Sequence, residues 1–247
     1  MSLERHTQDW ERLAEADALW AVLTVPGRRG GGWDVDEFFA TGEAEVDHVL
    51  DVAASLGLPA GRERALDFGC GVGRLTRALA GRFETATGVD ISTRMIEQAR
   101  LLNESVPAAR FEVNAAVDLA RFDAASFDLV YSGIVLQHLP SVADIERYVR
   151  EFLRVVRPDG IVVFGIPCHI PLPWSLQPRR RAYALLRRVG VSESWLLRRT
   201  PLTPMRMTVV PETPVRRLLD EAGARLLQTE PIDQRPVRSL RYYASAR

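Results

Sequence analysis

Residues 66–74 read LDFGCGVGR, an apolar stretch that contains the carboxylate of Asp67 and continues into Gly69, Gly71, Gly73 and Arg74. Glycines at every second position after a strand predict a tight turn that lets a ligand approach the backbone. A helix that begins near Arg74 would present free N–H groups, which favour an anion. We therefore expect this turn to bind a ligand.

The spacing of the glycines argues against a dinucleotide. A dinucleotide turn needs G-x-G-x-x-G, and its third glycine would fall at Arg74 counted from Gly69, or at Thr76 counted from Gly71. The anion held at this turn can therefore be a carboxylate. Asp90 follows at the end of the next apolar run, where it can accept hydrogen bonds from two ribose hydroxyls. We expect a ligand that contains ribose.

Short apolar runs alternate with amphipathic stretches from Ala65 onward. The runs are RALDFG, TATGVD, ARFEVN, FDLVYS and GIVVFGIP. Alternation of strand and helix predicts parallel strands joined by right-handed crossovers, and nearly continuous apolar strands predict a sheet covered on both faces. Two later strands lie too close together for a crossover helix and should form an antiparallel hairpin. The predicted fold class is α/β: a doubly wound, mostly parallel, Rossmann-like sheet of seven strands with an antiparallel last strand.

We expect four segments along the chain. Residues 1–60 form an N-terminal helical cap, with helices over 8–23 and from about Thr41, and residues 61–169 form the ligand-binding core. Residues 170–207 form an insertion rich in arginine and proline after the fifth strand, and residues 208–247 complete the sheet. We expect the insertion to be a lid over the acceptor. The alternatives are a contact for an anionic substrate or lipid headgroup, the interface of a homodimer, or a solvated helix pair.

Composition excludes several functions. The 32 Asp and Glu balance the 32 basic residues, which argues against nucleic acid as a partner of the whole surface. Every basic residue is arginine, so no lysine can form a Schiff base or act as a nucleophile. No apolar stretch has the length of a membrane span and no secretory signal is recognisable, so we expect a cytoplasmic protein without integral membrane association. Cys70 and Cys168 suit no disulfide framework, and no compact cluster of Asp, Glu and His predicts a metal site.

Five segments of the chain, taken in order, resemble the successive motifs of class I S-adenosylmethionine-dependent methyltransferases. These segments are LDFGCGVGR, GVDIS, FEVNAAVDL, FDLVYSGIVLQHLP and FLRVVRPDGIVVFGIP. The resemblance covers about residues 64–167. The upstream segment WDVDEFFATGEAEVDHVL is similar to a bacterial branch of the family whose members we associate with sugars and natural products. The resemblance implies S-adenosylmethionine as the cofactor and S-adenosylhomocysteine as the product.

The resemblance also implies a role for individual residues. Those around the methionine part of the cofactor are Asp67, Gly69, Cys70, Gly71 and Gly73, with Arg74 close to its carboxylate and Ser132 and Gly133 near the sulfonium. Those around the nucleoside are Asp90 on the ribose, Ile91 and Met95 on the adenine faces, Asn114 on the exocyclic amine and the Ala115 backbone on a ring nitrogen. Asn stands at 114 where the family often has Asp, and its side-chain oxygen can do the same work.

A second group of residues lies upstream of the core. Trp33, Phe38, Phe39, Thr41 and Gly42 are expected either to form a flap over the cofactor or to pack the first helices together. Sequence leaves these two alternatives open.

Methyl transfer is an in-line displacement, and an alcohol acceptor also needs a base to take its proton. Histidine suits that role near pH 7. His138 follows the fourth strand in VLQHLP and His169 follows the fifth in IPCHIP, at the strand ends where ligands bind in α/β sheets. His6 and His48 lie in the helical cap and are expected on a solvated face.

We therefore expect a methyltransferase that acts on a hydroxyl of a small molecule, such as a sugar or glycosylated natural product, with a histidine general base. Three alternatives remain. They are a small-molecule N-methyltransferase, a protein or RNA methyltransferase, and a non-catalytic S-adenosylmethionine-binding module.

Overall fold

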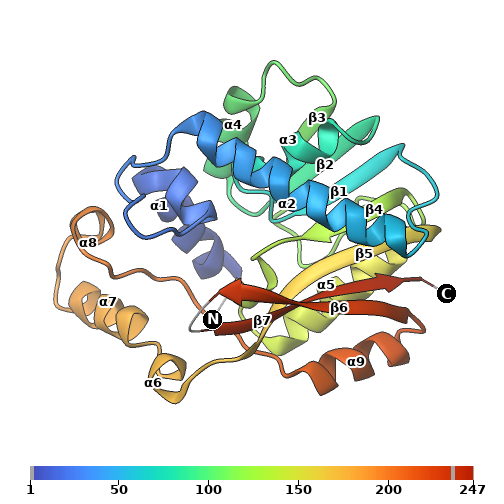
Figure 1. Cartoon of the computed structure of the whole chain (residues 1–247). Helices are drawn as coiled ribbons and strands as arrows, with labels where there is room; N and C mark the ends of the chain where they lie inside the picture. The colour runs from blue at the N-terminus through green and yellow to red at the C-terminus, as the bar shows by residue number, and fades with distance from the viewer. Residues whose placement is uncertain (1–2, 235–236, 247) are drawn as a thin grey trace.

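The apolar runs form strands of one sheet in the computed structural model, which describes residues 3–234 and 237–246. The strands are β1 (Arg64–Phe68), β2 (Thr85–Asp90), β3 (Ala109–Val113), β4 (Phe127–Ser132), β5 (Val156–His169), β6 (Arg225–Gln234) and β7 (Val237–Ser245). Among the described residues these seven strands are arranged in the order β3-β2-β1-β4-β5-β7-β6. The first five are parallel, and β7 is antiparallel to both β5 and β6. The predicted fold class is confirmed (Figure 1).

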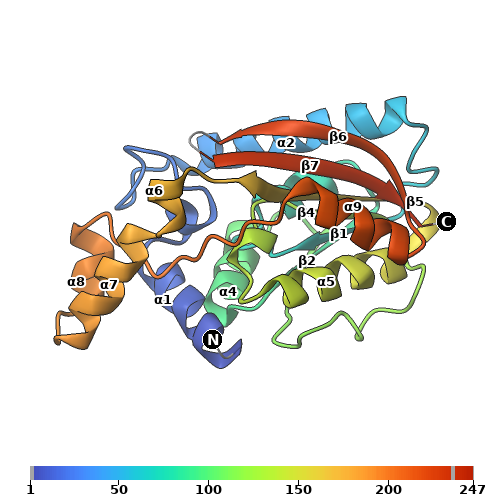
Figure 2. The same cartoon turned by 90° about the horizontal axis from the view of Figure 1, so that it is seen from below.

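Side chains alternate between the two faces of the sheet, as strand geometry requires. Leu66, Val130 and Val162 pack on one face against α5 (Val142–Val155) and α9 (Glu212–Glu221). Their neighbours Ala65, Leu129 and Val163 pack on the other face against α2 (Val35–Ser55) and α3 (Arg74–Ala80). Figure 2 shows α2 on one side of the sheet, with α5 and α9 on the other. Helices on both faces bury the sheet and leave its strand ends free to form a site.

Helix α2 begins earlier than the sequence analysis predicted. Asp34 is its N-cap, and the Asp34 carboxylate accepts a hydrogen bond of 2.9 Å from the backbone N–H of Glu37. An aspartate cap followed by Asp36 and Glu37 in the first turn favours this start. The predicted start near Thr41 is wrong by about two turns, because the Asp34 cap begins the helix at Val35.

The first helix, α1 (Leu3–Val22), lies over the start of α4 (Thr93–Leu102). It is kinked at Asp17, whose backbone is not helical. The Glu11 carboxylate accepts hydrogen bonds from the backbone N–H groups of Thr93 and Arg94, at 2.6 and 3.3 Å. A carboxylate at a helix N-terminus is favourable, so this contact fixes α1 above the carboxyl end of β2.

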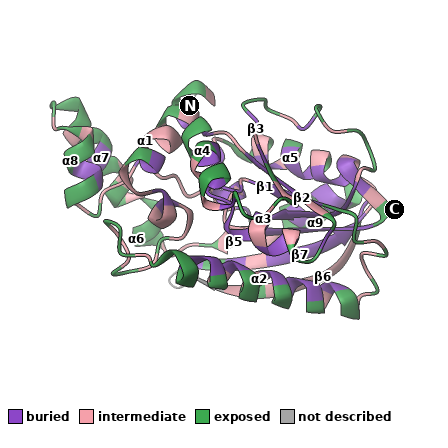
Figure 3. Cartoon of the chain, turned by 90° about the horizontal axis from the view of Figure 1, so that it is seen from above, coloured by how far each residue is buried: buried purple, intermediate pink, exposed green. Residues whose placement is uncertain are grey.

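The insertion forms three helices and an extended return. The helices are α6 (Leu172–Ser175), α7 (Pro178–Arg188) and α8 (Glu193–Arg199). Tyr183, Leu196 and Leu197 are buried in one cluster with Leu13 of α1. Figure 1 shows α7 and α8 beside α1 and away from the sheet, and Figure 3 shows their outer faces exposed. The chain returns along the short helix η1 (Leu136–His138), where the Thr208 N–H donates to the Gln137 carbonyl at 2.7 Å.

Candidate active site

The turn after β1 requires its glycines. Gly69 and Gly71 have φ angles of +76° and +54°, a region that residues with a side chain rarely adopt. A Cβ would also lie 2.3 Å from the Val135 side chain at Gly69, and 2.3 Å from the Val22 side chain at Gly71. Val22 is at the end of α1, so the first helix packs directly on the turn.

Asp90 ties the end of β2 to this turn. One of its carboxylate oxygens accepts from the Gly71 N–H and the other from the Ser92 N–H, each at 2.9 Å. Burial raises the pKa of Asp90 to about 6, although these two hydrogen bonds favour the charged form. Each carboxylate oxygen keeps a further lone pair. The carboxylate is thus held in place and can still accept hydrogen bonds.

Arg74, at the start of α3, is buried and held by α2. Its guanidinium forms an ion pair of 2.7 Å with Glu45, which also accepts from the Tyr131 hydroxyl at 2.5 Å. Burial alone would raise the pKa of Glu45, but Arg74, Tyr131 and Arg241 together hold it below its ordinary value. Among the described residues, the buried Nε of Arg74 has no hydrogen-bond partner. One donor of this guanidinium is therefore free.

Asp67 lies close by at the end of β1. Its carboxylate accepts a hydrogen bond of 2.6 Å from the Thr76 hydroxyl. Burial raises the pKa of Asp67 to about 7, against the effects of Thr76 and Arg74. Cys70 is buried beside it, and burial raises the pKa of the Cys70 thiol well above its ordinary value, so this thiol is no nucleophile.

These strand ends open into a cavity of about 290 Å³. Most of the predicted cofactor residues line it, namely Asp67, Gly69, Cys70, Gly71, Arg74, Asp90, Ile91, Met95, Asn114 and Gly133. The Asn114 side-chain amide donates to the Asp118 carbonyl at 3.0 Å, which leaves its oxygen as a free acceptor. One cavity therefore joins the positions predicted for the methionine part and for the nucleoside.

Three predicted cofactor residues lie beside the cavity and not on its wall. A Cβ on Gly73 would meet the Phe111 ring at 2.7 Å, so this glycine serves close packing. The buried Ser132 hydroxyl donates to the Phe68 carbonyl at 3.2 Å. Ala115 is exposed beyond the end of β3.

The proposed flap residues pack the helices together. Phe38 and Phe39 are buried, and Trp33 contacts Phe38 edge-on with ring centroids 5.6 Å apart. The Thr41 hydroxyl lies 3.4 Å from the Arg74 guanidinium. A Cβ on Gly42 would lie 2.3 Å from the Arg74 carbonyl oxygen, so Gly42 lets α2 and α3 approach. None of the five lines the cavity. The geometry favours the packing alternative.

The residues of the N-terminal region that line the cavity belong mainly to α1 and not to the proposed flap. Leu3, His6 and Trp10 line the cavity, at the i, i+3 and i+7 spacing that places side chains on one helix face. The expectation that His6 lies on a solvated face is wrong: this residue is only 6% exposed. Burial, with smaller effects from His138 and Arg206, lowers the pKa of His6 to about 4. The apolar spacing was a usable signal, but only the tertiary contact shows what the face covers.

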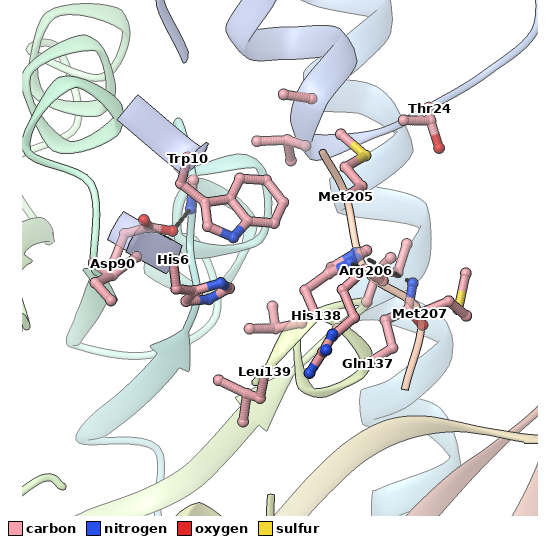
Figure 4. Close-up of a pocket in the computed structure, with 18 of the residues that line it drawn as sticks. His6, Trp10, Thr24, Asp90, Gln137, His138, Leu139, Met205, Arg206 and Met207 are labelled. Atoms are coloured by element: carbon pink, nitrogen blue, oxygen red, sulfur yellow. Dashed lines mark hydrogen bonds between the residues drawn. The ribbon is translucent and has the colours of Figure 1, made fainter. Parts of the chain in front are cut away.

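His138 is held in a defined tautomer. Its Nδ1 lies 2.7 Å from the backbone oxygen of Arg206, and since a carbonyl only accepts, Nδ1 carries the hydrogen. Its Nε2 then has a lone pair, and the Gln137 amide lies 3.3 Å from it. Burial lowers the pKa of His138 to about 4. Figure 4 shows His138 beside Trp10 and His6 in the cavity, and the Trp10 and His138 ring centroids are 5.3 Å apart.

The other two histidines lie elsewhere. His169 is exposed at the end of β5 and does not line the cavity, so it does not face an acceptor there. The pairing of β5 with β7 shifts register between Pro167 and His169, and such irregularities re-aim side chains. His48 is exposed, as predicted, and contacts Glu230 at 3.1 Å.

The arginine-rich insertion supplies the rest of the wall. Its cavity-lining residues include Trp174, Gln177, Arg179, Arg180, Met205 and Arg206. The position of this segment after β5 predicts that it lies near the strand ends, but no local pattern in its sequence singles out these residues. In the part of the chain that the structure describes, no group of three or more His, Cys, Asp and Glu could hold a metal ion. No helix among those residues has the length and apolar character needed to cross a bilayer.

Known proteins share this core. Residues 66–164 match the family model described as a methyltransferase domain. The chain is 36% identical over 108 residues to the ubiquinone biosynthesis O-methyltransferase of Thiobacillus denitrificans, covering 43% of this chain and 45% of the relative. It is 37% identical over 122 residues to the malonyl-[acyl-carrier protein] O-methyltransferase of Salmonella typhimurium, covering 49% and 46%. The match thus spans less than half the length of either relative.

The fold is also that of solved methyltransferases. The N-methyltransferase NodS from Bradyrhizobium japonicum WM9, solved in complex with S-adenosyl-L-homocysteine, superimposes with a TM-score of 0.60 at 19% identity, covering 98% of each chain. At this identity the likeness concerns the fold alone. Residues 66–164 are therefore similar to a methyltransferase domain, within a chain that has the fold of the class I S-adenosylmethionine-dependent methyltransferases.

Proposed function

We propose that this chain transfers the methyl group of S-adenosylmethionine to a hydroxyl oxygen of a small molecule, with His138 as general base. The methyltransferase domain and the two O-methyltransferases among its relatives support the reaction class. The proposal goes beyond these relatives in assigning the base and the acceptor group.

The residues of the cavity fit the cofactor. Arg74 has a buried Nε–H without a partner among the described residues, which suits a carboxylate. Asp90 has free lone pairs for the ribose hydroxyls, and the Asn114 oxygen is free for the amine of adenine. Ile91 and Met95 offer apolar walls to the ring. Bound there, S-adenosylmethionine supplies a methyl group on a positively charged sulfur.

The observation that carries the proposal is the tautomer of His138. The hydrogen on Nδ1 is held by the Arg206 carbonyl, so Nε2 carries the lone pair, which accepts from the Gln137 amide at 3.3 Å until an acceptor hydroxyl takes that place. An acceptor hydroxyl that reaches Nε2 can give up its proton as its oxygen is methylated. Trp10 fixes the ring from one side. Burial lowers the pKa of His138 to about 4, so the imidazole is neutral at pH 7 and can accept a proton, and a negative charge bound beside it would raise this pKa towards the range that suits a general base.

The cavity favours a small acceptor. Side chains of α1 and of the insertion enclose the cavity on its acceptor side, and its walls include Trp10, Leu139 and Met205. A sugar or a glycosylated natural product, expected from the resemblance, belongs to this class if its reactive hydroxyl enters beside His138.

An N-methyltransferase is the second candidate, since the solved N-methyltransferase NodS shows that this fold also carries out N-methylation. A neutral amine can attack without a base, so the two functions differ in what they need from His138. A protein or RNA methyltransferase would need a macromolecular acceptor, and a non-catalytic module would bind the cofactor without turnover.

Two measurements test the proposal. Calorimetry should show that S-adenosylhomocysteine binds, and a screen with isotope-labelled S-adenosylmethionine against small alcohols, phenols, amines, peptides and RNA should identify the acceptor. With a hydroxyl acceptor, His138→Gln should lower kcat roughly 10²–10⁴-fold without weakening S-adenosylhomocysteine binding. His48→Gln, far from the cavity, is the control. An unchanged kcat in His138→Gln would contradict the role of His138 as the base. Failure of the wild-type chain to bind S-adenosylhomocysteine would contradict the proposed function.

A further inference from the structure

Two arginines of the insertion share one region of the cavity. Arg180 of α7 and Arg206 of the extended return both line the main cavity. They also line a smaller neighbouring cavity together with Gln177. Burial lowers the pKa of Arg180, and the next largest cause is the charge of Arg206. The two guanidinium groups are therefore close enough to repel each other.

In the part of the chain that the structure describes, neither guanidinium has a carboxylate partner. Among the described residues, Arg206 donates to the Pro140 carbonyl, and no ion pair is formed by either arginine. Asp9 is the acidic group that acts on Arg180, and only from a distance. Arg12 of α1 and Arg187 of α7, by contrast, both contact Glu193, at 3.2 and 3.5 Å. Arg180 and Arg206 are half-buried on the cavity wall without such a contact among the described residues.

Half-buried like charges without a counter-ion are unfavourable, and an anion between them removes that cost. Guanidinium groups bind carboxylate and phosphate oxygens through directed hydrogen bonds. Arg206 is also the residue whose carbonyl holds His138. An anion bound by the Arg206 guanidinium would lie in the same cavity as the base.

A third observation points to a ligand in the same region. The side-chain oxygen of Gln177 is buried and has no hydrogen-bond partner among the described residues, while its amide donates to the Met207 carbonyl at 2.9 Å. Gln177 also has a φ of +47°, a costly conformation for a residue with a side chain. A buried acceptor that lacks a donor, on the wall of both cavities, suits a hydroxyl of the bound molecule.

We propose that the methyl acceptor carries a carboxylate or phosphate group, which Arg180 and Arg206 bind, and a polar hydrogen that Gln177 accepts. This inference rests on the proposed function and names the class of its substrate: a small hydroxylated acid with an apolar body. The anion has a second effect. When His138 takes the acceptor's proton it becomes a cation, and a neighbouring negative charge stabilises that cation.

The test uses the full chain saturated with S-adenosylhomocysteine. Calorimetry compares benzoate, phenyl phosphate and neutral benzyl alcohol, because the cavity also offers the rings of Trp10 and Trp174 to an apolar body. At least one of the two anions should bind at least tenfold more tightly than benzyl alcohol. The anion that binds more tightly shows whether the acceptor's charged group is a carboxylate or a phosphate. Arg180→Gln and Arg206→Gln should each lower anion affinity about tenfold or more, since a hydrogen bond to a charged group is lost.

Arg198→Gln is the matched control, because Arg198 is exposed on α8 and lines no cavity described above. It should leave anion binding unchanged. Equal binding of benzyl alcohol and the anions, or an equal loss in Arg198→Gln, would overturn the inference. Each variant is checked for S-adenosylhomocysteine binding first. Loss of that binding in the wild-type chain contradicts the proposed function, whereas normal cofactor binding without anion binding contradicts this inference alone.

Discussion

Replacing the buried His6 with glutamine should change how stability depends on pH. Burial first, then the charges of His138 and Arg206, lower the pKa of His6 from 6.5 to about 4. Between these two values the unfolded chain binds a proton at this site and the folded chain does not. Stability contributed by the neutral ring is therefore present above pH 6.5 and is lost as the pH falls towards 4. Glutamine cannot take up this proton.

The size of the effect follows from the two pKa values. A shift of one unit corresponds to about 1.4 kcal/mol, and linkage between 6.5 and about 4 gives a loss of about 2 kcal/mol on going from pH 7 to pH 4.5. Asp67 and Asp90 act in the opposite direction, because burial raises their pKa values to about 7 and about 6. Both carboxylates are present in the wild type and in the variant, so their effects cancel in the difference.

Urea unfolding of both proteins at pH 7 and pH 4.5 measures this difference. The free energy of unfolding of His6→Gln relative to wild type should rise by about 2 kcal/mol on acidification, whatever its value at pH 7. His48→Gln should show no such rise, because the His48 side chain is 56% exposed. A difference for His6→Gln that is the same at both pH values would refute the burial of a neutral ring against His138.

Two further substitutions test the support of the cofactor site, each with a control nearby. Glu45→Gln should destabilise the fold by about 3–5 kcal/mol in urea unfolding and weaken S-adenosylhomocysteine binding, because Arg74 loses its carboxylate partner and Arg241 keeps only Glu230. Asp47, also on α2, forms an exposed pair with Arg82, so Asp47→Asn is the control, with a loss below about 1 kcal/mol. Gly42→Ala should lower stability by roughly 1–3 kcal/mol, since its Cβ would lie 2.3 Å from the Arg74 carbonyl oxygen. Gly81→Ala is the control, because its new Cβ meets only the Ala78 oxygen at 3.4 Å. The melting temperature of Gly42→Ala should therefore be clearly lower than that of Gly81→Ala.

The cofactor half of the cavity could be predicted because its signals are local. The glycines of 69–73 must adopt a turn that other residues avoid, and Asp90 follows at the end of the next strand. Parallel strands bring both features to one edge of the sheet, so sequence spacing is enough to place them together. The hydrogen bond from Gly71 to Asp90 is the direct result.

The acceptor half could not be predicted in the same way, because it is assembled from distant segments. Trp10, His138 and Arg206 meet in space although long stretches of chain separate them. His6 was misplaced since its spacing shows an apolar face without showing what covers it. His169 was placed near the acceptor by its position after β5, yet the shifted register with β7 leaves it exposed.

The contact between Arg206 and His138 couples the insertion to the base. The ring hydrogen stays on Nδ1 because the backbone oxygen of Arg206 accepts it, so the lone pair on Nε2 depends on where the insertion returns to the sheet. Thr208 strengthens this return, as its N–H and hydroxyl donate to the carbonyls of Gln137 and Leu139. A displaced insertion would release Nδ1 and lose the arginines of the wall at the same time. One segment therefore shapes the acceptor site and fixes the tautomer of its base, so a change of acceptor specificity made in the insertion must preserve the backbone of 206–208 to keep the base functional.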